Sequence, residues 1–253
     1  LYDHMFMDGL EDAYTGRAMG TFAQETADQR GLTREAMDAF AIESLSRAKA
    51  AIEDGSLKPE TVPVTVKTRK GETVVEDDEQ PHKAAVDKIP ALRPAFAKEG
   101  TITAANASSI SDGASALVLM SGSEAERRGI NGTAELVAHA RHSQAPEEFT
   151  LAPIGAISKL LDKTGWSVED VDLFEINEAF AMVTMLSMLD LGLPHDKVNI
   201  HGGACAQGHP IGSTGSRIIV SLMYALKKTG GKRGIAALCI GGGEATAVAI
   251  ELR

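Results

Sequence analysis

The sequence predicts an α/β protein in which a layered sheet domain follows a polar, helix-rich first third. Strand-like and helix-like segments alternate from about residue 133 to the end, and glycines close the predicted helices. Alternation of this kind indicates a largely buried sheet with helices packed on its faces. Because 43% of the 253 residues are hydrophobic, the chain can bury one large core or two modest ones.

One long helix and one hairpin are predicted in the first third. Apolar residues recur at helical spacing between Met37 and Ile52. Thr33 is the candidate N-cap of this helix, and Gly55 is the candidate stop. Residues 62–75 are then predicted to form two short strands around a turn.

The sequence becomes more apolar near residue 101. Residues 114–120 form an apolar run, with only Ser115 polar, that is bounded by Gly and Ser and is typical of a buried strand. Ser123 and Glu126 have the spacing of a capping box, which predicts a short helix that ends near Gly129.

The elements after this point are predicted from alternating patterns. Strands are expected at residues 134–140, 171–176, 198–200, 235–240 and 246–252, and helices at residues 154–163, 178–191 and 213–228. Catalytic residues of such domains tend to lie in the loops at strand ends. Three such junctions in this chain hold chemically active side chains.

Composition excludes several classes of protein. The formal net charge of −10 argues against a nucleic-acid binder, which normally carries a basic face. The two cysteines, Cys205 and Cys239, form no CxxC or Cys/His pattern, so we expect no metal site and no disulfide scaffold. No apolar stretch is long enough to span a bilayer, and the first residues do not resemble a signal peptide. We therefore expect no membrane partner and a cytoplasmic, reducing location.

The first chemically suggestive junction is the glycine-rich stretch 201–212, which holds His209. Four glycines in these twelve residues allow close backbone approaches, and Pro210 biases His209 toward an extended conformation. Histidine titrates near neutral pH and suits proton transfer or the polarisation of a carbonyl. The alternative is a histidine that only satisfies the hydrogen bonds of a turn.

Two further junctions hold Cys239 and Asn177. Cys239 ends an apolar strand directly before Gly241, Gly242 and Gly243, whose amides could serve as oxyanion donors. Asn177 falls between a strand and a helix, where it could bind water or substrate. The alternatives are a small buried cysteine and an asparagine that caps the helix, with Glu178 as a first-turn acid. Cys205 is interpreted as a packing residue.

In their order along the chain, these junctions resemble the signature motifs of the thiolase family. The motifs are Asn177-Glu178-Ala179-Phe180, then Gly208-His209-Pro210-Ile211-Gly212, then Cys239-x-Gly241-Gly242-Gly243. Upstream segments resemble the loop region of that family, namely Asp8-Gly9-Leu10, Met19-Gly20, residues 92–96 and residues 103–108. The resemblance covers essentially the whole chain.

The resemblance implies an acyl-CoA:acyl-CoA C-acyltransferase of fatty-acid metabolism, which condenses two acetyl-CoA molecules or cleaves a 3-oxoacyl-CoA. Cys239 would be the acid/base, His209 would activate the nucleophilic thiol, Asn177 would position a water, and the Gly241 amide would contribute to a second oxyanion site. Seven residues would line the coenzyme A and acyl channel, namely Leu10, Met19, Ala104, Ser108, Phe149, Ala179 and Phe180. Coenzyme A would be a substrate, no cofactor would be permanently bound, and the protein would be a homodimer or homotetramer.

The resemblance also implies a layered αβα fold with an incomplete N-terminal half. We expect a loop domain that binds coenzyme A in residues 1–110, a return segment of the missing half in residues 111–131, and a C-terminal domain in residues 132–253. The cysteine that the family acylates has no counterpart here, because neither Cys205 nor Cys239 occupies its motif. We therefore expect a fragment that is inactive alone. The alternative is a non-catalytic protein that binds acyl-CoA or lipid.

Overall fold

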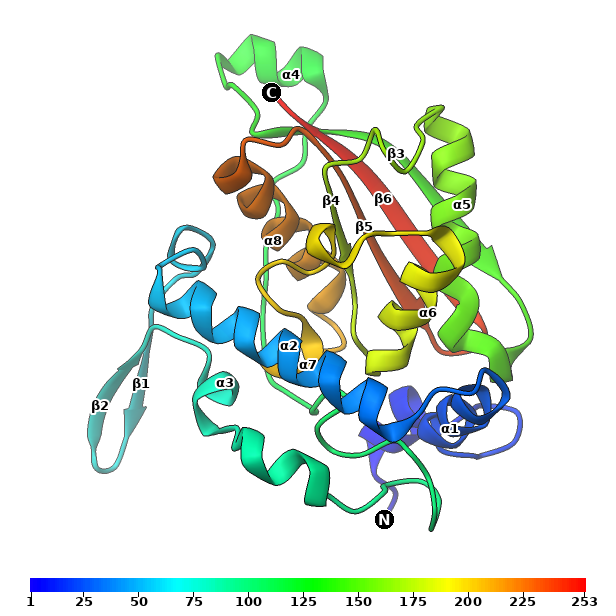
Figure 1. The fold of residues 1–253 in the computed structure, drawn as a ribbon. Helices are drawn as coiled ribbons and strands as arrows, with labels where there is room; N and C mark the ends of the chain where they lie inside the picture. Colours follow the sequence, from blue (N-terminus) through cyan, green and yellow to red (C-terminus); the bar gives the residue numbers. More distant parts are fainter.

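The computed structural model describes residues 1–253 and confirms the predicted α/β class (Figure 1). The main sheet has the strand order β3-β6-β5-β4, and only the pair β4 and β5 is parallel. Its strands are β3 (Ala134–Ser143), β4 (Leu173–Ile176), β5 (Arg233–Ile240) and β6 (Glu244–Leu252). A separate exposed hairpin contains β1 (Val64–Thr68) and β2 (Gly71–Val75), as the sequence predicted.

Helices flank this sheet and fill the first third of the chain. The α-helices are α1 (Met19–Gln29), α2 (Arg34–Glu53), α3 (Glu79–Lys83), α4 (Gly122–Arg128), α5 (Ala152–Thr164), α6 (Ala181–Leu191), α7 (Ala204–Gln207) and α8 (Thr214–Thr229). Short irregular helices are η1 (Phe6–Leu10), η2 (Lys58–Glu60), η3 (Val86–Ala91), η4 (Pro146–Leu151) and η5 (His195–Lys197). None of the helices combines the length and the hydropathy needed to cross a bilayer.

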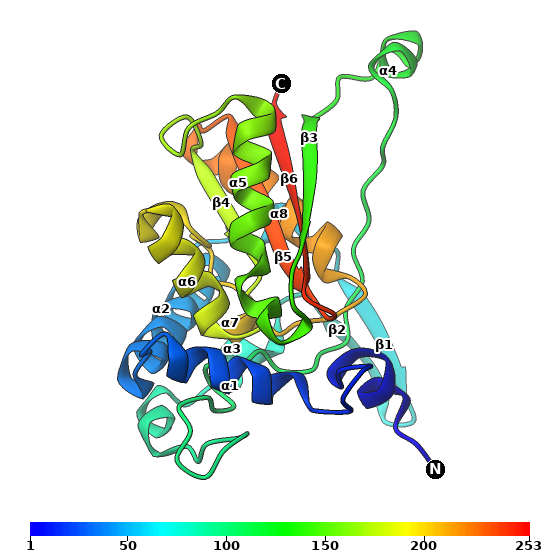
Figure 2. The ribbon, with the colours of Figure 1, turned by 90° about the vertical axis from the view of Figure 1, so that its right-hand side faces the viewer.

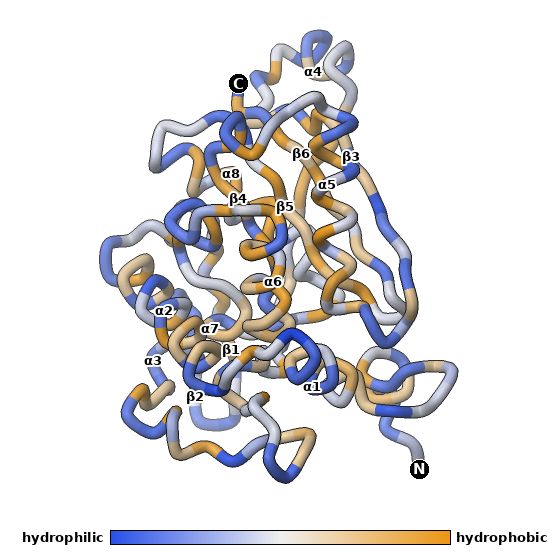
Figure 3. The backbone as a smooth tube through the Cα atoms, turned by 45° about the vertical axis from the view of Figure 1, so that its right-hand side comes forward, coloured by the Kyte–Doolittle hydropathy of each residue, from blue (hydrophilic) through white to orange (hydrophobic).

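Opposite faces of the sheet are covered by α5 and α8, which Figure 2 shows on either side of the strands. Successive side chains of a strand point to opposite faces. Phe174 of β4 therefore packs in one fully buried cluster with Leu160 of α5, while Leu173 packs with Leu222 of α8. The strands and the helix faces that meet them are the hydrophobic centre of the molecule (Figure 3).

A second apolar cluster ties the first third of the chain to the sheet domain. Phe22 of α1, Met37 of α2 and Met182 of α6 are buried together in this cluster. The predicted N-cap and stop of α2 are present: the Thr33 hydroxyl accepts a hydrogen bond from the Ala36 N–H, and the helix ends at Glu53 with Asp54 as its C-cap, directly before Gly55. Local sequence and apolar spacing therefore place this helix correctly.

Residues 114–120 form no strand, contrary to the prediction. The segment starts beside α8, where the Ser115 hydroxyl donates to the Ser213 carbonyl oxygen over 2.9 Å, and then runs clear of the sheet toward α4 (Figure 2). Val118 and Leu119 are 87% and 74% exposed. An apolar run becomes a strand only beside a partner strand, and here none lies next to it.

Two smaller predictions were wrong at the level of single residues. The N-cap of α4 is Ser121, whose hydroxyl accepts from the Glu124 N–H, so the capping box at Ser123 does not form. Residues 198–200 make only an isolated bridge between Val198 and Phe174. In the first place the capping hydroxyl lies two residues earlier than predicted, and in the second the pairing with β4 is limited to one isolated bridge.

Candidate active site

Asn177 and Cys239 lie at the same edge of the main sheet. Asn177 directly follows β4, and its N–H donates to the carbonyl oxygen of Ala237 over 2.9 Å. Cys239 comes two residues after Ala237, near the end of β5. Because β4 and β5 are parallel, their carboxyl ends meet at one edge, which is the usual place of a ligand site in such sheets.

The segment 106–110 brings His209 to this edge. On one side the Ser108 N–H donates to the Ala179 carbonyl oxygen over 3.0 Å. On the other side the His209 N–H donates to the Ser109 carbonyl oxygen over 3.0 Å. Ala179 is two residues from Asn177. This single extended segment therefore holds the stretch 201–212, here called the histidine loop, against the junction after β4.

The hydrogen bonds of the His209 ring define its tautomer. Nδ1 lies 2.6 Å from the Thr214 hydroxyl, and that hydroxyl donates its only hydrogen to the Pro210 carbonyl oxygen over 3.0 Å. In the tautomer that satisfies both contacts, Nδ1–H donates to the Thr214 oxygen and Nε2 of the neutral ring is a proton acceptor. Sequence reasoning missed Thr214; its place at the start of the helix, five residues after His209, was the available signal.

The electrostatic surroundings keep His209 neutral. Burial, together with the smaller effect of the positive charge of Arg217 on α8, lowers the pKa of His209 to about 4. At neutral pH the imidazole is therefore unprotonated and able to accept a proton.

Asn177 is not a helix cap, contrary to one interpretation of its position. The N-cap residue of α6 is Phe180, and the helix starts at Ala181 instead of Glu178. The Asn177 side chain is 1% exposed, and neither its oxygen nor its nitrogen has a hydrogen-bond partner in the protein. A buried amide with both polar atoms free is costly, and this one is available to bond a water or a ligand.

Cys239 is enclosed beside the glycine turn that joins β5 to β6. Its residue is 8% exposed, and burial raises the pKa of its thiol to about 12, so it is protonated at neutral pH. Gly242 and Gly243 have φ of +83° and +82°, which glycine adopts without strain. A side-chain carbon at Gly241 would lie 3.7 Å from the Met19 methyl group. The turn therefore offers backbone next to both the thiol and Met19.

Several of the predicted lining residues gather around Cys239. Met19, Phe149 and Cys239 are buried in one apolar cluster, with Ala179 and Phe180 packed against it. The Phe149 and Phe180 rings meet edge to face with centroids 6.4 Å apart. Cys239 therefore lies in the same apolar cluster as Met19 and Phe149.

The other predicted lining residues are farther from this cluster. Leu10 is half-buried at the end of η1, and the adjacent Gly9 lies against Ile211 in the histidine loop. Ala104 is exposed, whereas Ser108 is half-buried and its hydroxyl donates to the Ala179 carbonyl oxygen. Leu10 is therefore connected to the site through the contact of its neighbour Gly9 with Ile211, and Ser108 through its hydrogen bond to Ala179.

Cys205 is placed as a packing residue, as predicted. It packs against the same apolar cluster, and its Sγ donates to the Glu178 carbonyl oxygen over 3.8 Å. Burial and the Glu178 carboxylate raise the pKa of this thiol well above its usual value. A thiol that stays protonated is a poor nucleophile.

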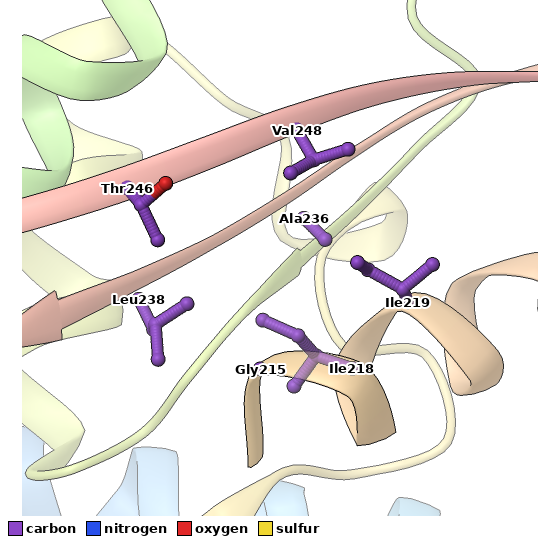
Figure 4. A pocket seen from close by; sticks show the side chains of 7 residues that line it. All are labelled: Gly215, Ile218, Ile219, Ala236, Leu238, Thr246 and Val248. Carbon is purple, nitrogen blue, oxygen red and sulfur yellow. The ribbon is translucent and has the colours of Figure 1, made fainter. Parts of the chain in front are cut away.

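An apolar pocket lies between α8 and strands β5 and β6, on the face of the sheet opposite the Cys239 side chain (Figure 4). Its lining residues are Gly215, Ile218, Ile219, Ala236, Leu238, Thr246 and Val248. Leu238 points into this pocket, so its neighbour Cys239 points away from it. The pocket is therefore separate from the side chains described above.

Comparison with known proteins identifies relatives over both halves of the chain. The family model described as "Thiolase, N-terminal domain" matches residues 1–123, and "Thiolase, C-terminal domain" matches residues 130–252. An acetyl-CoA acetyltransferase of Yarrowia lipolytica is 46% identical over 99% of this chain, and one of Shinella zoogloeoides is 47% identical over 99%. Because both models match, the expected absence of the N-terminal segment is not confirmed.

Solved structures show the same similarity. The crystal structure of the Bacillus anthracis acetyl-CoA acetyltransferase superposes with a TM-score of 0.93 at 42% identity over 96% of this chain and 62% of its own. The Ascaris suum Acat5 thiolase, solved in complex with coenzyme A, gives 0.89 at 37% identity over 100% of this chain and 65% of its own. The chain spans 63% and 64% of the length of the two curated relatives above.

Proposed function

The chain belongs to the thiolase family, and from that premise we propose that it supplies the acid/base and oxyanion-site residues of an acetyl-CoA C-acetyltransferase. One observation supports this most strongly. A neutral imidazole with a free Nε2, a buried amide without partners and an enclosed thiol all lie at the carboxyl edge of one parallel strand pair. Acyl transfer through an enolate needs a proton acceptor, a proton donor and oxyanion donors.

In this proposal His209 acts twice. Its Nε2 first takes the proton of the attacking thiol, so the thiolate can attack the thioester carbonyl. The resulting Nε2–H then donates to the thioester oxygen, together with a water held by the free amide of Asn177. The bond to Thr214 keeps Nδ1 protonated and the ring aimed in one direction.

Cys239 moves the α-proton. In cleavage, the acyl-carrying thiolate attacks the 3-oxo carbon and keeps the acyl group as its thioester, the carbon–carbon bond of the 3-oxoacyl-CoA breaks, and the departing enolate takes the Cys239 proton to give acetyl-CoA. A thiol that is protonated at neutral pH suits this direction. In condensation the same sulfur, as thiolate, removes the α-proton of acetyl-CoA, and the Gly241 amide stabilises the oxyanion of the acyl group under attack.

We also propose that the thiol that carries the acyl group is neither cysteine of this chain. Cys205 is buried and protonated, and Cys239 is assigned to proton transfer. Coenzyme A and its acetyl thioester are the proposed substrates, which the coenzyme A complex of the Ascaris relative supports. A homodimer or homotetramer is proposed from the family resemblance alone.

The exchange of α-hydrogens tests this proposal without the acyl-carrying thiol. The purified protein is incubated with acetyl-CoA in deuterium oxide, and deuterium in the acetyl group is measured by mass spectrometry. We expect exchange by the wild type and a loss of about 100-fold or more in Cys239→Ala, which removes a general acid/base. Cys205→Ala is the matched control and should exchange at close to the wild-type rate.

Two results would contradict the proposal. Equal exchange by Cys239→Ala and wild type would remove Cys239 from proton transfer. Binding of coenzyme A by the wild type with no exchange at all would instead indicate a protein that only binds acyl-CoA.

A further inference from the structure

Glu178 is a fully buried carboxylate that the mechanism above does not use. It follows Asn177, precedes α6 and is 0% exposed, so it is not the exposed first-turn acid suggested by the sequence. Burial raises the pKa of Glu178, and hydrogen bonds from three donors oppose that shift. A buried charge of this kind persists only where surrounding groups fix it in place.

The three donors come from three separate segments. Oε1 accepts from the Asn199 side-chain amide over 2.8 Å. Oε2 accepts from the Ser44 hydroxyl of α2 over 2.8 Å and from the Cys205 N–H of α7 over 3.0 Å. The carboxylate therefore links the first third of the chain, the segment after η5 and the start of the histidine loop.

The neighbouring backbone is shaped around this carboxylate. The Gly203 N–H donates to the Ser44 hydroxyl over 2.9 Å. A side-chain carbon at Gly203 would lie only 2.3 Å from the Glu178 carboxyl carbon, so only glycine leaves room for the group. Gly203 and Cys205 begin the loop that ends at His209, four residues after Cys205.

Asn199, one of the three donors to Glu178, also bonds the last residue of β4, next to Asn177. The Asn199 side-chain oxygen accepts from the Ile176 N–H, and its amide donates to the Ile176 carbonyl oxygen, each over 2.8 Å. Glu178 and Asn199 together therefore fix the backbone on both sides of Asn177. The Ser44 hydroxyl, which bonds both Glu178 and the Gly203 N–H, adds a second tie between this junction and the stretch 201–212.

We propose that Glu178 is a positioning residue whose carboxylate sets the separation between the Asn177 amide and the His209 imidazole. In the proposed function both groups donate hydrogen bonds to one thioester oxygen, Asn177 through a water. This inference therefore rests on the proposed function. A displacement of about 1 Å in such a pair lowers rates about 100-fold, while the binding of the remote part of a substrate is unaffected.

The test compares Glu178→Gln with the matched control Glu175→Gln. Both glutamates are buried at the end of β4, but Glu175 makes no hydrogen bond with its carboxylate. We expect Glu178→Gln to lower the rate constant for α-hydrogen exchange of saturating acetyl-CoA by about 10- to 100-fold, with KM close to wild type. Glu175→Gln should exchange at close to the wild-type rate.

A second readout does not depend on catalysis. Amide hydrogen exchange, followed by mass spectrometry, should become faster in the peptide covering residues 203–209 in Glu178→Gln and stay unchanged in Glu175→Gln. If Glu178→Gln does not fold, Ser44→Ala removes one of the three donors and should give the same changes with smaller size.

Failure of the two proposals can be told apart. A wild type that shows no α-hydrogen exchange would overturn the proposed function, and the protection of residues 203–209 would still decide the role of Glu178. Unchanged protection in a folded Glu178→Gln, or a full exchange rate for acetyl-CoA, would overturn the positioning role.

Discussion

Replacing Glu175 with glutamine should stabilise the protein, and the gain should grow as pH rises. Burial raises the pKa of Glu175 to about 8 from its usual 4.5, with smaller effects from Arg217, Glu60 and Glu178. Between these values the unfolded chain has released the proton and the folded protein still holds it. The contribution of Glu175 to the free energy of unfolding is therefore fully present below pH 4.5 and is lost as pH rises toward 8.

The magnitude follows from the same two pKa values. Each pH unit inside this window changes the free energy of unfolding by about 1.4 kcal/mol. From pH 5 to pH 8 the Glu175→Gln variant should therefore gain about 3 kcal/mol relative to wild type, because glutamine has no proton to release. Glu60, whose pKa is raised to about 7 by burial, titrates in both proteins, so only its small coupling to Glu175 enters the difference.

Urea unfolding at pH 5, 6, 7 and 8 measures this difference. Trp166 is the only tryptophan and packs against the core beside α5, so its fluorescence reports unfolding of the sheet domain. The exposed Glu99→Gln is the control and should match wild type at every pH. A Glu175→Gln curve that stays parallel to wild type from pH 5 to pH 8 would refute the burial argument.

Three further predictions concern single side chains. The His209 ring, followed by NMR, should titrate with a midpoint near pH 4 instead of pH 6.5, because burial disfavours the charged imidazolium; a midpoint near 6.5 would contradict the burial of the ring. Leu160→Ala should lower the free energy of unfolding by about 2–5 kcal/mol in urea titrations, whereas the half-exposed Leu136→Ala should cost far less. Thr33→Ala should cost about 0.5–2 kcal/mol through loss of its cap, and an unchanged midpoint would mean that the cap is redundant.

The three chemically active residues could be found from sequence because each follows a local rule. His209 precedes a proline in a glycine-rich stretch, Cys239 precedes three glycines at a strand end, and Asn177 ends an apolar strand. Their convergence could not be found in this way. It depends on segment 106–110, which lies about 70 residues before Asn177 in sequence and pairs with both halves of the site.

The sequence by itself determined the elements whose causes are local. Helical apolar spacing with Thr33 at the start placed α2, and Gly165 at φ of +70° closed α5 where the pattern ended. Hydrophobic periodicity and glycine conformation act within a few residues, so they can be seen without a fold.

Tertiary structure alone decided the fate of residues whose partners are distant in sequence. Residues 114–120 have the composition of a strand but no neighbour to pair with, and Glu178 has the position of a first-turn acid but lies inside the protein. Its donors Ser44 and Asn199 are 134 and 21 residues away. Burial and long-range hydrogen bonds set the role of such groups, and both arise only when the chain is packed.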